Sequence, residues 1–75
     1  MRDVEILVQP VELYKILKFE AMVSSGGEAK LAIDLGHVLV NGEVEHRKRK
    51  KIVSGDIIEY AGEQLHIVFN GSVEN

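Results

Sequence analysis

The sequence predicts an α+β domain in which two helices pack as a pair on a small, mostly antiparallel sheet. Three features support this prediction. Short apolar runs typical of strands occur at residues 4–8, 52–53, 57–60 and 65–69. Between residues 11 and 35, apolar side chains recur at helical spacing, and an Asn-Gly pair at residues 41–42 then marks a hairpin turn. A strand, two helices and several short strands, in that order, place the helices on one face of the sheet.

The length and composition indicate one folded domain. Seventy-five residues suffice for a single domain, here residues 1–75 with a motif core at 11–60 and a frayed polar tail at 70–75. The chain has no Cys, which excludes disulfides and thiolate metal sites and indicates a reducing compartment. No apolar run approaches the ~20 residues of a membrane span, and residues 1–3 do not resemble the start of a signal peptide. The expected location is the cytoplasm.

A first helix is predicted over residues 11–22. Pro10 suits its first turn, where the missing N–H has no helical partner to lose. Leu13, Ile16 and Leu17, followed by the pair Glu20-Ala21, recur at helical spacing. The lysines at positions 15 and 18 then share the exposed face.

A second helix is predicted over residues 26–35. Ser25 and Glu28 have the spacing of a capping box, and Gly36 is expected to end the helix in the left-handed conformation. Its buried stripe is Ala29, Ala32 and Ile33. Because Glu28 already occupies the positive end of the helix dipole, the glycines at 26–27 are interpreted as packing residues. A phosphate bound at their amides remains the alternative.

The hairpin around residues 41–42 has two alternative registers. A two-residue loop would place Val40 opposite Glu43 and so put valines on the same face as carboxylates. A three-residue loop, with Gly42 at positive φ, avoids this mixture and is therefore predicted. It gathers Val38, Val40 and Val44 on the buried face, and leaves on the exposed face Glu43, Glu45, Arg47 and Arg49.

Positive charge is concentrated beside this hairpin. Five of the nine Lys and Arg residues form the unbroken run 47–51, although the net charge of the chain is −3. Residues 15–51 sum to +3, and the segments on either side sum to −2 and −4. Because charges act over a Debye length of ~8–10 Å, this local excess outweighs the overall acidity and favours a polyanionic partner.

The remaining side chains indicate neither an enzyme nor a metal site. The serines at 24–25 are explained by the helix cap, and the carboxylates are scattered. In the three-residue register His37 and His46 point to opposite faces and cannot share an ion. No cofactor is predicted. The aromatic residues are interpreted mostly as core, which argues against a stacking platform for single strands: Tyr14, Phe19, Tyr60 and Phe69. Partial exposure of Tyr14 or Tyr60 remains the alternative.

The partner that fits these features best is structured RNA, held through its phosphates. Arg forks in the run match phosphate oxygens, and further lysines lie on the two helices. The predicted RNA-binding residues are Lys15, Lys18, Lys30, Arg47, Lys48, Arg49, Lys50 and Lys51. The rival prediction is a protein-interaction module whose basic run docks on an acidic protein.

The sequence resembles the RNA-binding domain first recognised in ribosomal protein S-four of the small subunit. The shared pattern is a Ser opening the second helix, an Ala-basic pair, an Ile, G-x-V-x-V-N-G and G-D-x-I. Residues 25, 29–30, 33, 36–42 and 55–58 supply it here, and the likeness covers residues 11–60. The SGG-x-AK form and the basic run look most like the small stand-alone bacterial members, some of which are associated with ribosome maturation.

The resemblance implies an alpha-L RNA-binding motif: a helix pair on a small sheet, with RNA bound across the helices and the adjoining loop. A ribosome or ribosomal precursor is then an implied partner. Two expected contacts are missing. Gly26 stands where many members have Arg, and Glu12-Leu13-Tyr14 stands where many have Arg-Leu-Asp. The run at 47–51 is interpreted as their replacement, since many members have an uncharged segment there.

Overall fold

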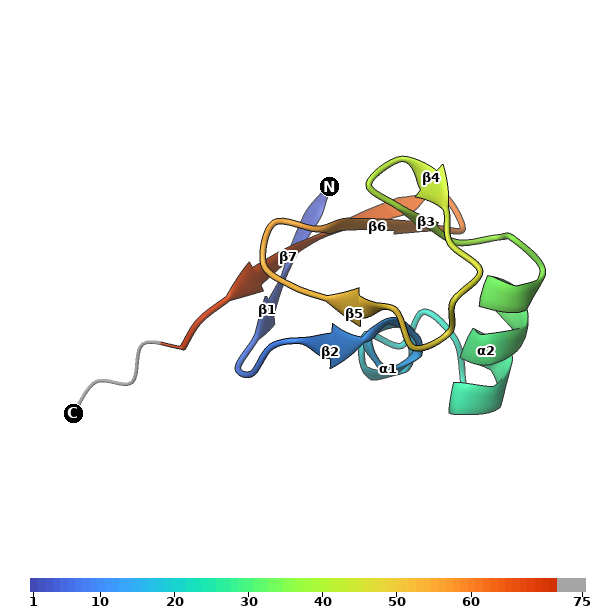
Figure 1. The fold of residues 1–75 in the computed structure, drawn as a ribbon, viewed down its shortest axis with the longest axis horizontal. Helices are drawn as coiled ribbons and strands as arrows, with labels where there is room; N and C mark the ends of the chain where they lie inside the picture. The colour runs from blue at the N-terminus through green and yellow to red at the C-terminus, as the bar shows by residue number, and fades with distance from the viewer. Residues whose placement is uncertain (72–75) are drawn as a thin grey trace.

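The computed structural model describes residues 1–71 and contains two helices and seven strands. In chain order these are β1 (Arg2–Ile6), β2 (Val11–Glu12), α1 (Leu13–Phe19), α2 (Gly26–Asp34), β3 (Leu39–Val40), β4 (Glu43–Val44), β5 (Lys51–Ile52), β6 (Ile57–Tyr60) and β7 (Glu63–Phe69) (Figure 1). None of the helices within these residues has the length and apolar character needed to cross a membrane.

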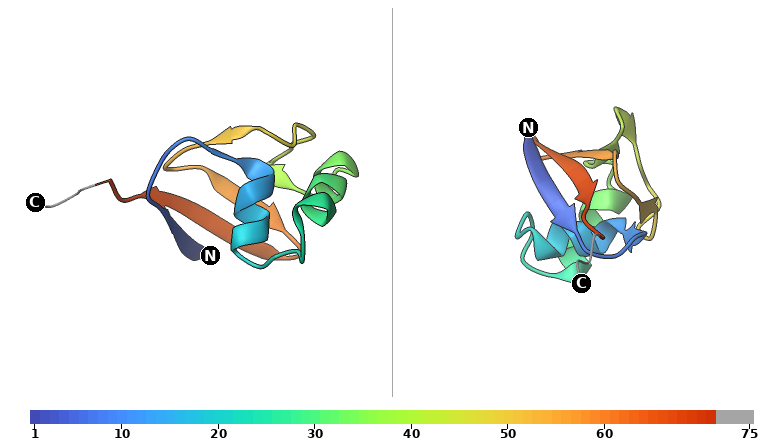
Figure 2. Two further views of the ribbon diagram at one scale, coloured as in Figure 1. Left: turned by 90° about the horizontal axis from the view of Figure 1, so that it is seen from below. Right: turned by 90° about the vertical axis from the view of Figure 1, so that its left-hand side faces the viewer.

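The strands form two sheets. Five of them follow the order β1-β7-β6-β3-β4, and β2 pairs with β5 as a separate two-stranded ribbon. Only the β1–β7 pair is parallel. The helices lie on one side of the five-stranded sheet, with α2 beside α1 (Figure 2). This arrangement confirms the predicted α+β fold, a helix pair packed on a small, mostly antiparallel sheet.

The helix α1 is shorter than predicted at both ends. Val11 and Glu12 pair with Ile52 and Lys51 of β5, so the helix begins at Leu13 and Pro10 precedes it by three positions rather than opening its first turn. At the other end Ala21 has a φ of 59°, and the chain leaves the helix there. The sequence hides this end because the left-handed position is usually glycine, and here it is alanine.

The helix α2 follows the prediction closely. Ser25 Oγ accepts a hydrogen bond from the Glu28 amide at 3.0 Å, as an N-cap should. The Glu28 carboxylate reaches one residue further back than expected, and accepts from the Ser24 amide at 2.9 Å and hydroxyl at 2.6 Å. These bonds lower the pKa of Glu28. Gly36, with φ 80°, ends the helix as predicted.

Replacing Ser25 by Ala is expected to lower the free energy of unfolding by about 1 kcal/mol, because the Glu28 amide loses its acceptor. The matched control is Ser24→Ala, which removes only the hydroxyl donor to an exposed carboxylate and should cost less. Urea denaturation followed by circular dichroism would measure both variants. Equal losses would contradict the assignment of Ser25 as the cap.

The β3–β4 hairpin corrects the predicted register. Val40 lies opposite Glu43, and Leu39 lies opposite Val44, so the loop has two residues rather than three. Asn41 and Gly42 have φ values of 54° and 86°, the positive angles that such a turn requires. Val44 is 50% exposed and does not join the core. The prediction was wrong because β4 is an edge strand, in which both residues are exposed, and such a strand need not bury one face.

The hairpin turn is fastened to a second turn by side-chain hydrogen bonds. Asn41 Oδ1 accepts from the Ile57 amide at 2.9 Å, and its Nδ2 donates to Asp56 at 3.0 Å. The other carboxylate oxygen of Asp56 accepts from the Val53 amide at 2.9 Å. The Asn-Gly and Gly-Asp pairs, which are part of the pattern shared with the family, therefore have a structural role: they hold the two turns together.

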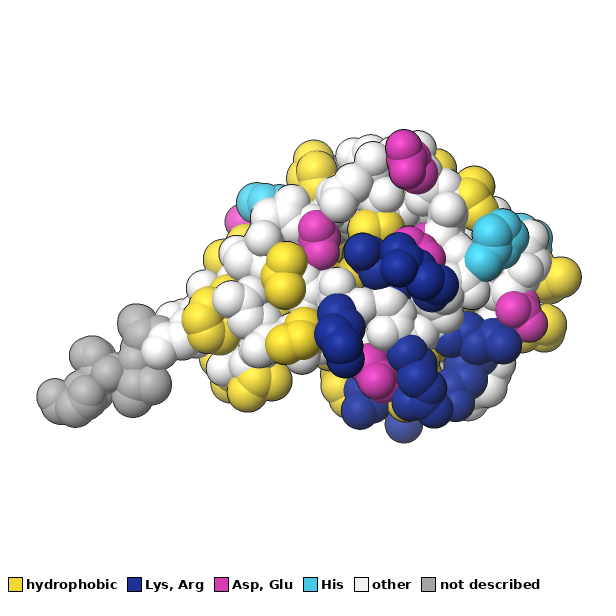
Figure 3. Space-filling model, viewed as in Figure 1, with side chains coloured by type: hydrophobic (Ala, Val, Ile, Leu, Met, Phe, Trp, Pro, Cys, Tyr) yellow, Lys and Arg dark blue, Asp and Glu magenta, His cyan; other side chains and the backbone are white. Residues whose placement is uncertain are grey.

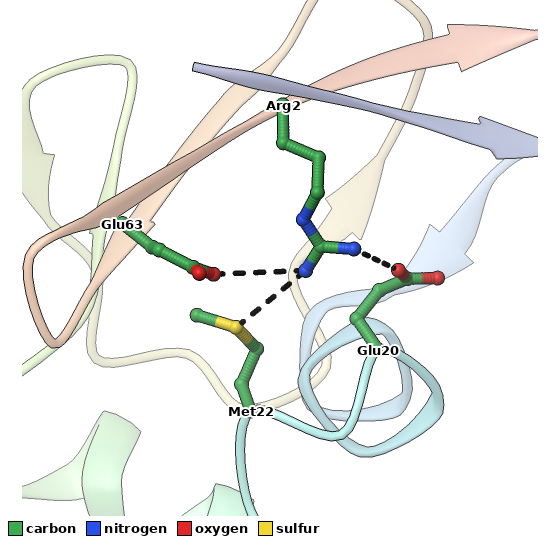
Figure 4. Close-up of polar contacts among 4 residues, drawn as sticks. All are labelled: Arg2, Glu20, Met22 and Glu63. Atoms are coloured by element: carbon green, nitrogen blue, oxygen red, sulfur yellow. Dashed lines mark hydrogen bonds and ion pairs between the residues drawn. The ribbon is translucent and has the colours of Figure 1, made fainter.

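Polar contacts also tie residues near both ends of the described segment, 1–71, to the fold. Arg2 bonds to Glu20 at 2.9 Å and approaches Glu63 at 3.6 Å and the Met22 sulfur at 3.9 Å (Figure 4). The amide of Asn70, the first residue of the predicted tail, donates to the Ile6 carbonyl at 2.9 Å. That part of the tail is thus attached to β1, and residues 72–75 lie outside the described residues.

Candidate functional site

The backbone of the basic run is bonded to the start of α1. The amides of Leu13 and Tyr14 donate to the carbonyls of Lys50, at 2.9 Å, and Lys48, at 3.1 Å. These amides belong to the first helical turn, where no helical carbonyl is available to them. Because Glu12 makes no side-chain cap, the basic run supplies the acceptors instead. The run is therefore held as part of the fold.

Side-chain exposure alternates along the run. Arg47, Arg49 and Lys51 are exposed, whereas Lys48 and Lys50 are half-buried. The outward direction of the two arginines agrees with the prediction, although the register from which it was argued is wrong. It follows from the turn at residues 48–49 and from the carbonyls that point toward α1.

Tyr14 is the centre of a cluster of cations. The ring centroid lies 4.6 Å from Lys30 Nζ, 5.4 Å from the Arg49 guanidinium and 6.0 Å from Lys15 Nζ. These distances are within the range of cation–π attraction. The three cations come from α2, the basic run and α1. One half-buried aromatic ring thus brings together three segments that are far apart in the sequence.

The remaining predicted residues surround this cluster. A β-carbon added at Gly26 would lie 3.7 Å from the Tyr14 ring and 4.0 Å from Cδ of Lys18, so Lys18 borders the cluster. Lys48 pairs with Asp34 near the end of α2 at 3.4 Å. Lys51 lies opposite Glu12 in the β2–β5 ribbon.

Three carboxylates lie among these cations. Glu12 accepts from Arg49 at 3.2 Å and lies 3.8 Å from Lys15. Glu45 binds Arg47 through both of its oxygens, at 2.8 and 3.1 Å. The Arg47 guanidinium holds the pKa of Glu45 below its ordinary value, so the carboxylate stays charged. With Asp34, these groups offset three of the eight predicted cations and leave an excess of five.

The cations form one surface, which we call the basic face and define as the eight predicted residues. Lys and Arg side chains gather over β5, the loop before it and the adjoining helices (Figure 3). Of the nine basic residues in the chain, Arg2 alone was not assigned to this face, and its guanidinium is engaged with Glu20 and Glu63. The fold brings the basic run and the helix lysines together.

Sequence reasoning did not assign two aromatic residues to this region. Tyr14 was interpreted mostly as core, with partial exposure of Tyr14 or Tyr60 as the alternative; its ring is half-buried, and its contact with the cations was not predicted. Phe19 was also assigned to the core and is 66% exposed. Lysines one and four residues after Tyr14, at positions 15 and 18, gave a signal for the first. The exposure of Phe19 could have been predicted only from the end of α1 at this residue.

The histidines were not predicted to share a metal ion. The observed hairpin register removes the reason for separating His37 from His46. Even so, the structure contains, within residues 1–71, no group of three His, Cys, Asp or Glu side chains arranged to hold an ion. His66 instead lies 3.1 Å from Asp3 on the neighbouring strand.

The sequence model described as "S4 domain" matches residues 4–68. The chain belongs to the S4 domain family. Two positions at which this S4 domain differs from the family pattern lie side by side, because Tyr14 packs on Gly26. A third such position, Glu12, binds Arg49.

Relatives in two bacteria resemble the S4 domain described here. One from Escherichia coli K12, named "Putative RNA-binding protein YbcJ", is 48% identical over 58 residues, which cover 77% of this chain and 83% of that protein. "Probable ribosome maturation protein RlbA" from Bacillus subtilis 168 is 34% identical over 59 residues, which cover 79% and 83%. The solution structure of Escherichia coli YbcJ superposes with a TM-score of 0.69 at 43% identity, and covers 91% of this chain and 87% of that one. That structure of YbcJ is described as an αL motif involved in RNA binding.

Proposed function

We propose that this chain is a non-catalytic protein that binds structured RNA on the basic face. The bound RNA would be ribosomal or transfer RNA, and its phosphates would contact the eight predicted cations. The names of YbcJ and RlbA support this proposal, since one names RNA binding and the other ribosome maturation. The proposed role is in ribosome assembly or maturation, which agrees with both names. The proposed location of the protein is then the cytoplasm.

The observation that carries the proposal is the cluster around Tyr14. Lys15, Lys30 and Arg49 come from three segments, and each lies within 6.0 Å of the same ring. Like charges gathered this closely repel one another, so the arrangement gains from a polyanion that neutralises them. A-form RNA displays two rows of phosphates and suits such a surface without any reading of base sequence.

The local charge balance supports contact with several phosphates. Five cations remain after the three carboxylates are counted, and the Tyr14 ring carries no charge to offset them. Glu12, which stands where many family members carry Arg, pairs with Arg49, and this pair carries no net charge. The other cations of the basic run would supply the positive charge that this chain lacks at position 12.

A salt titration of RNA binding tests the proposal. If about five phosphates are neutralised, a plot of log affinity against log salt concentration should have a slope of roughly −3.5 to −4.5. The measurement is a mobility shift or anisotropy titration with total bacterial RNA at several salt concentrations. A slope near zero would contradict a phosphate-based interface.

A second experiment separates RNA from an acidic protein as the partner. Pull-down from lysate before and after nuclease treatment should show that captured ribosomal proteins are lost together with the RNA. Partners retained after complete RNA digestion would favour the protein-interaction module instead.

A further inference from the structure

One groove beside the basic face combines an apolar interior with charged groups at its rim. It is lined by Val8, Pro10, Val11, Glu12, Lys15, Phe19 and Lys51. The residues before β2 and the end of α1 supply its apolar walls, and β5 supplies Lys51. Figure 3 shows hydrophobic side chains directly beside the edge of the blue group of Lys and Arg. The groove is therefore continuous with the basic face.

Phe19 and Val8 are unusually exposed for side chains of their kind, at 66% each. Phe19 is one helical turn from Lys15, and both line this groove. A second groove adjoins it, shares Val8, Val11 and Phe19, and is lined mostly by apolar side chains. An aromatic ring that folding leaves in water costs solvation free energy, which a ligand covering the ring would recover.

We infer that this groove holds an unpaired nucleotide of the bound RNA, with its base against the Phe19 ring and its phosphates beside Lys15 and Lys51. A nucleotide joins an apolar ring face to an anionic phosphate, and the groove places an apolar wall beside two ammonium groups. Unpaired bases stack on aromatic side chains with little dependence on sequence. The Glu12 carboxylate at the rim is already engaged by Arg49 and Lys15, so it does not face the phosphate as a free charge. The inference rests on the proposed function and specifies which RNA fits: a duplex that continues into a single strand.

The test compares three probes: a blunt RNA hairpin, the same hairpin with a short uridine extension, and the same hairpin with an abasic ribose-phosphate extension. The uridine extension should strengthen binding by about fivefold or more over the abasic one. The abasic extension adds the same phosphates, so this ratio isolates the contribution of the bases. Equal affinities for the two extended probes would overturn the inference while leaving the proposed function intact. Failure of all three to bind would overturn both.

Substitutions of Phe19 test whether the groove causes the preference for uridine over abasic extensions. Phe19→Ala and Phe19→Leu should both abolish the preference for uridine over abasic extensions, and both should bind the blunt hairpin as the wild type does. The leucine variant keeps apolar bulk and guards against loss of folding, which thermal melting would check. Leu31→Ala, at an exposed leucine of α2 outside the groove, is the matched control and should retain the preference. A preference that survives in both Phe19 variants would overturn the assignment.

Discussion

The triple variant Lys30→Gln, Arg49→Gln and Lys51→Gln is expected to bind RNA roughly 100- to 500-fold more weakly than the wild type at 0.1 M salt. Each lost phosphate contact removes about 0.7 to 0.9 from the magnitude of the salt slope. The loss of three contacts therefore lowers the magnitude of the salt slope by about 2 to 2.7. If the contribution of counterion release vanishes near 1 M salt, this change in slope corresponds to the stated loss of affinity at 0.1 M salt. Anisotropy titrations at several salt concentrations measure both quantities.

These three residues are chosen because their loss should disturb the fold little. Among residues 1–71, neither Lys30 nor Lys51 has a carboxylate within ion-pair distance, and Arg49 makes an exposed pair with Glu12. Exposed pairs of this kind contribute about 0–1 kcal/mol to stability. Glutamine is preferred to glutamate, because a new carboxylate at position 49 would lie against Glu12.

Arg2→Gln is the matched control for this experiment. It also removes one positive charge, but from a side chain engaged with Glu20 and Glu63. The salt slope of this variant should equal that of the wild type, whatever small change in melting temperature it shows. If Arg2→Gln lowered the slope as much per charge as the triple variant, net charge rather than the basic face would control binding.

Replacing Ile52 by Ala is expected to lower the free energy of unfolding by about 2–5 kcal/mol. Ile52 has no exposed surface and lies opposite Val11 in the β2–β5 ribbon, directly after the basic run. Removing its side chain leaves a cavity under the strand that carries Lys51. A domain of this size has a total stability of about 4–11 kcal/mol, so the variant would be marginal. Urea denaturation followed by circular dichroism measures the loss.

Two substitutions bracket this result. Ile52→Val removes one methylene and should cost about 0.5–1.5 kcal/mol. Val53→Ala changes the next residue, which is 41% exposed, and should cost less than Ile52→Ala. If Val53→Ala were as costly as Ile52→Ala, the basic run would not be anchored through Ile52 as the structure indicates.

Local patterns predicted most of the fold for identifiable reasons. The buried stripes of both helices follow the 3.6-residue period, and they were confirmed at Leu13, Ile16 and Leu17 and again at Ala29 and Ile33. The cap at Ser25 was confirmed because it depends on residues three positions apart. Such features are decided by neighbours in the chain, which a sequence displays directly.

The errors arose where the position of a strand in its sheet decided the structure. The start of α1 was misplaced because β5, some forty positions away, pairs with Val11 and Glu12. The hairpin register was wrong because β4 lies at the edge of its sheet and does not have to bury one face. The first outcome depends on a partner outside the local window, and the second depends on the place of β4 in the sheet.

The sequence by itself determined the fold class, the helix pair, the family and the five adjacent cations of residues 47–51. Only the tertiary structure decided that Lys30 and Arg49 meet over one tyrosine ring and that Phe19 remains exposed beside Lys15 and Lys51. The physical reason is the separation along the chain over which each interaction acts. Helical periodicity and capping act over three or four residues, whereas the basic face and its groove are made by segments that approach one another only after the core has formed.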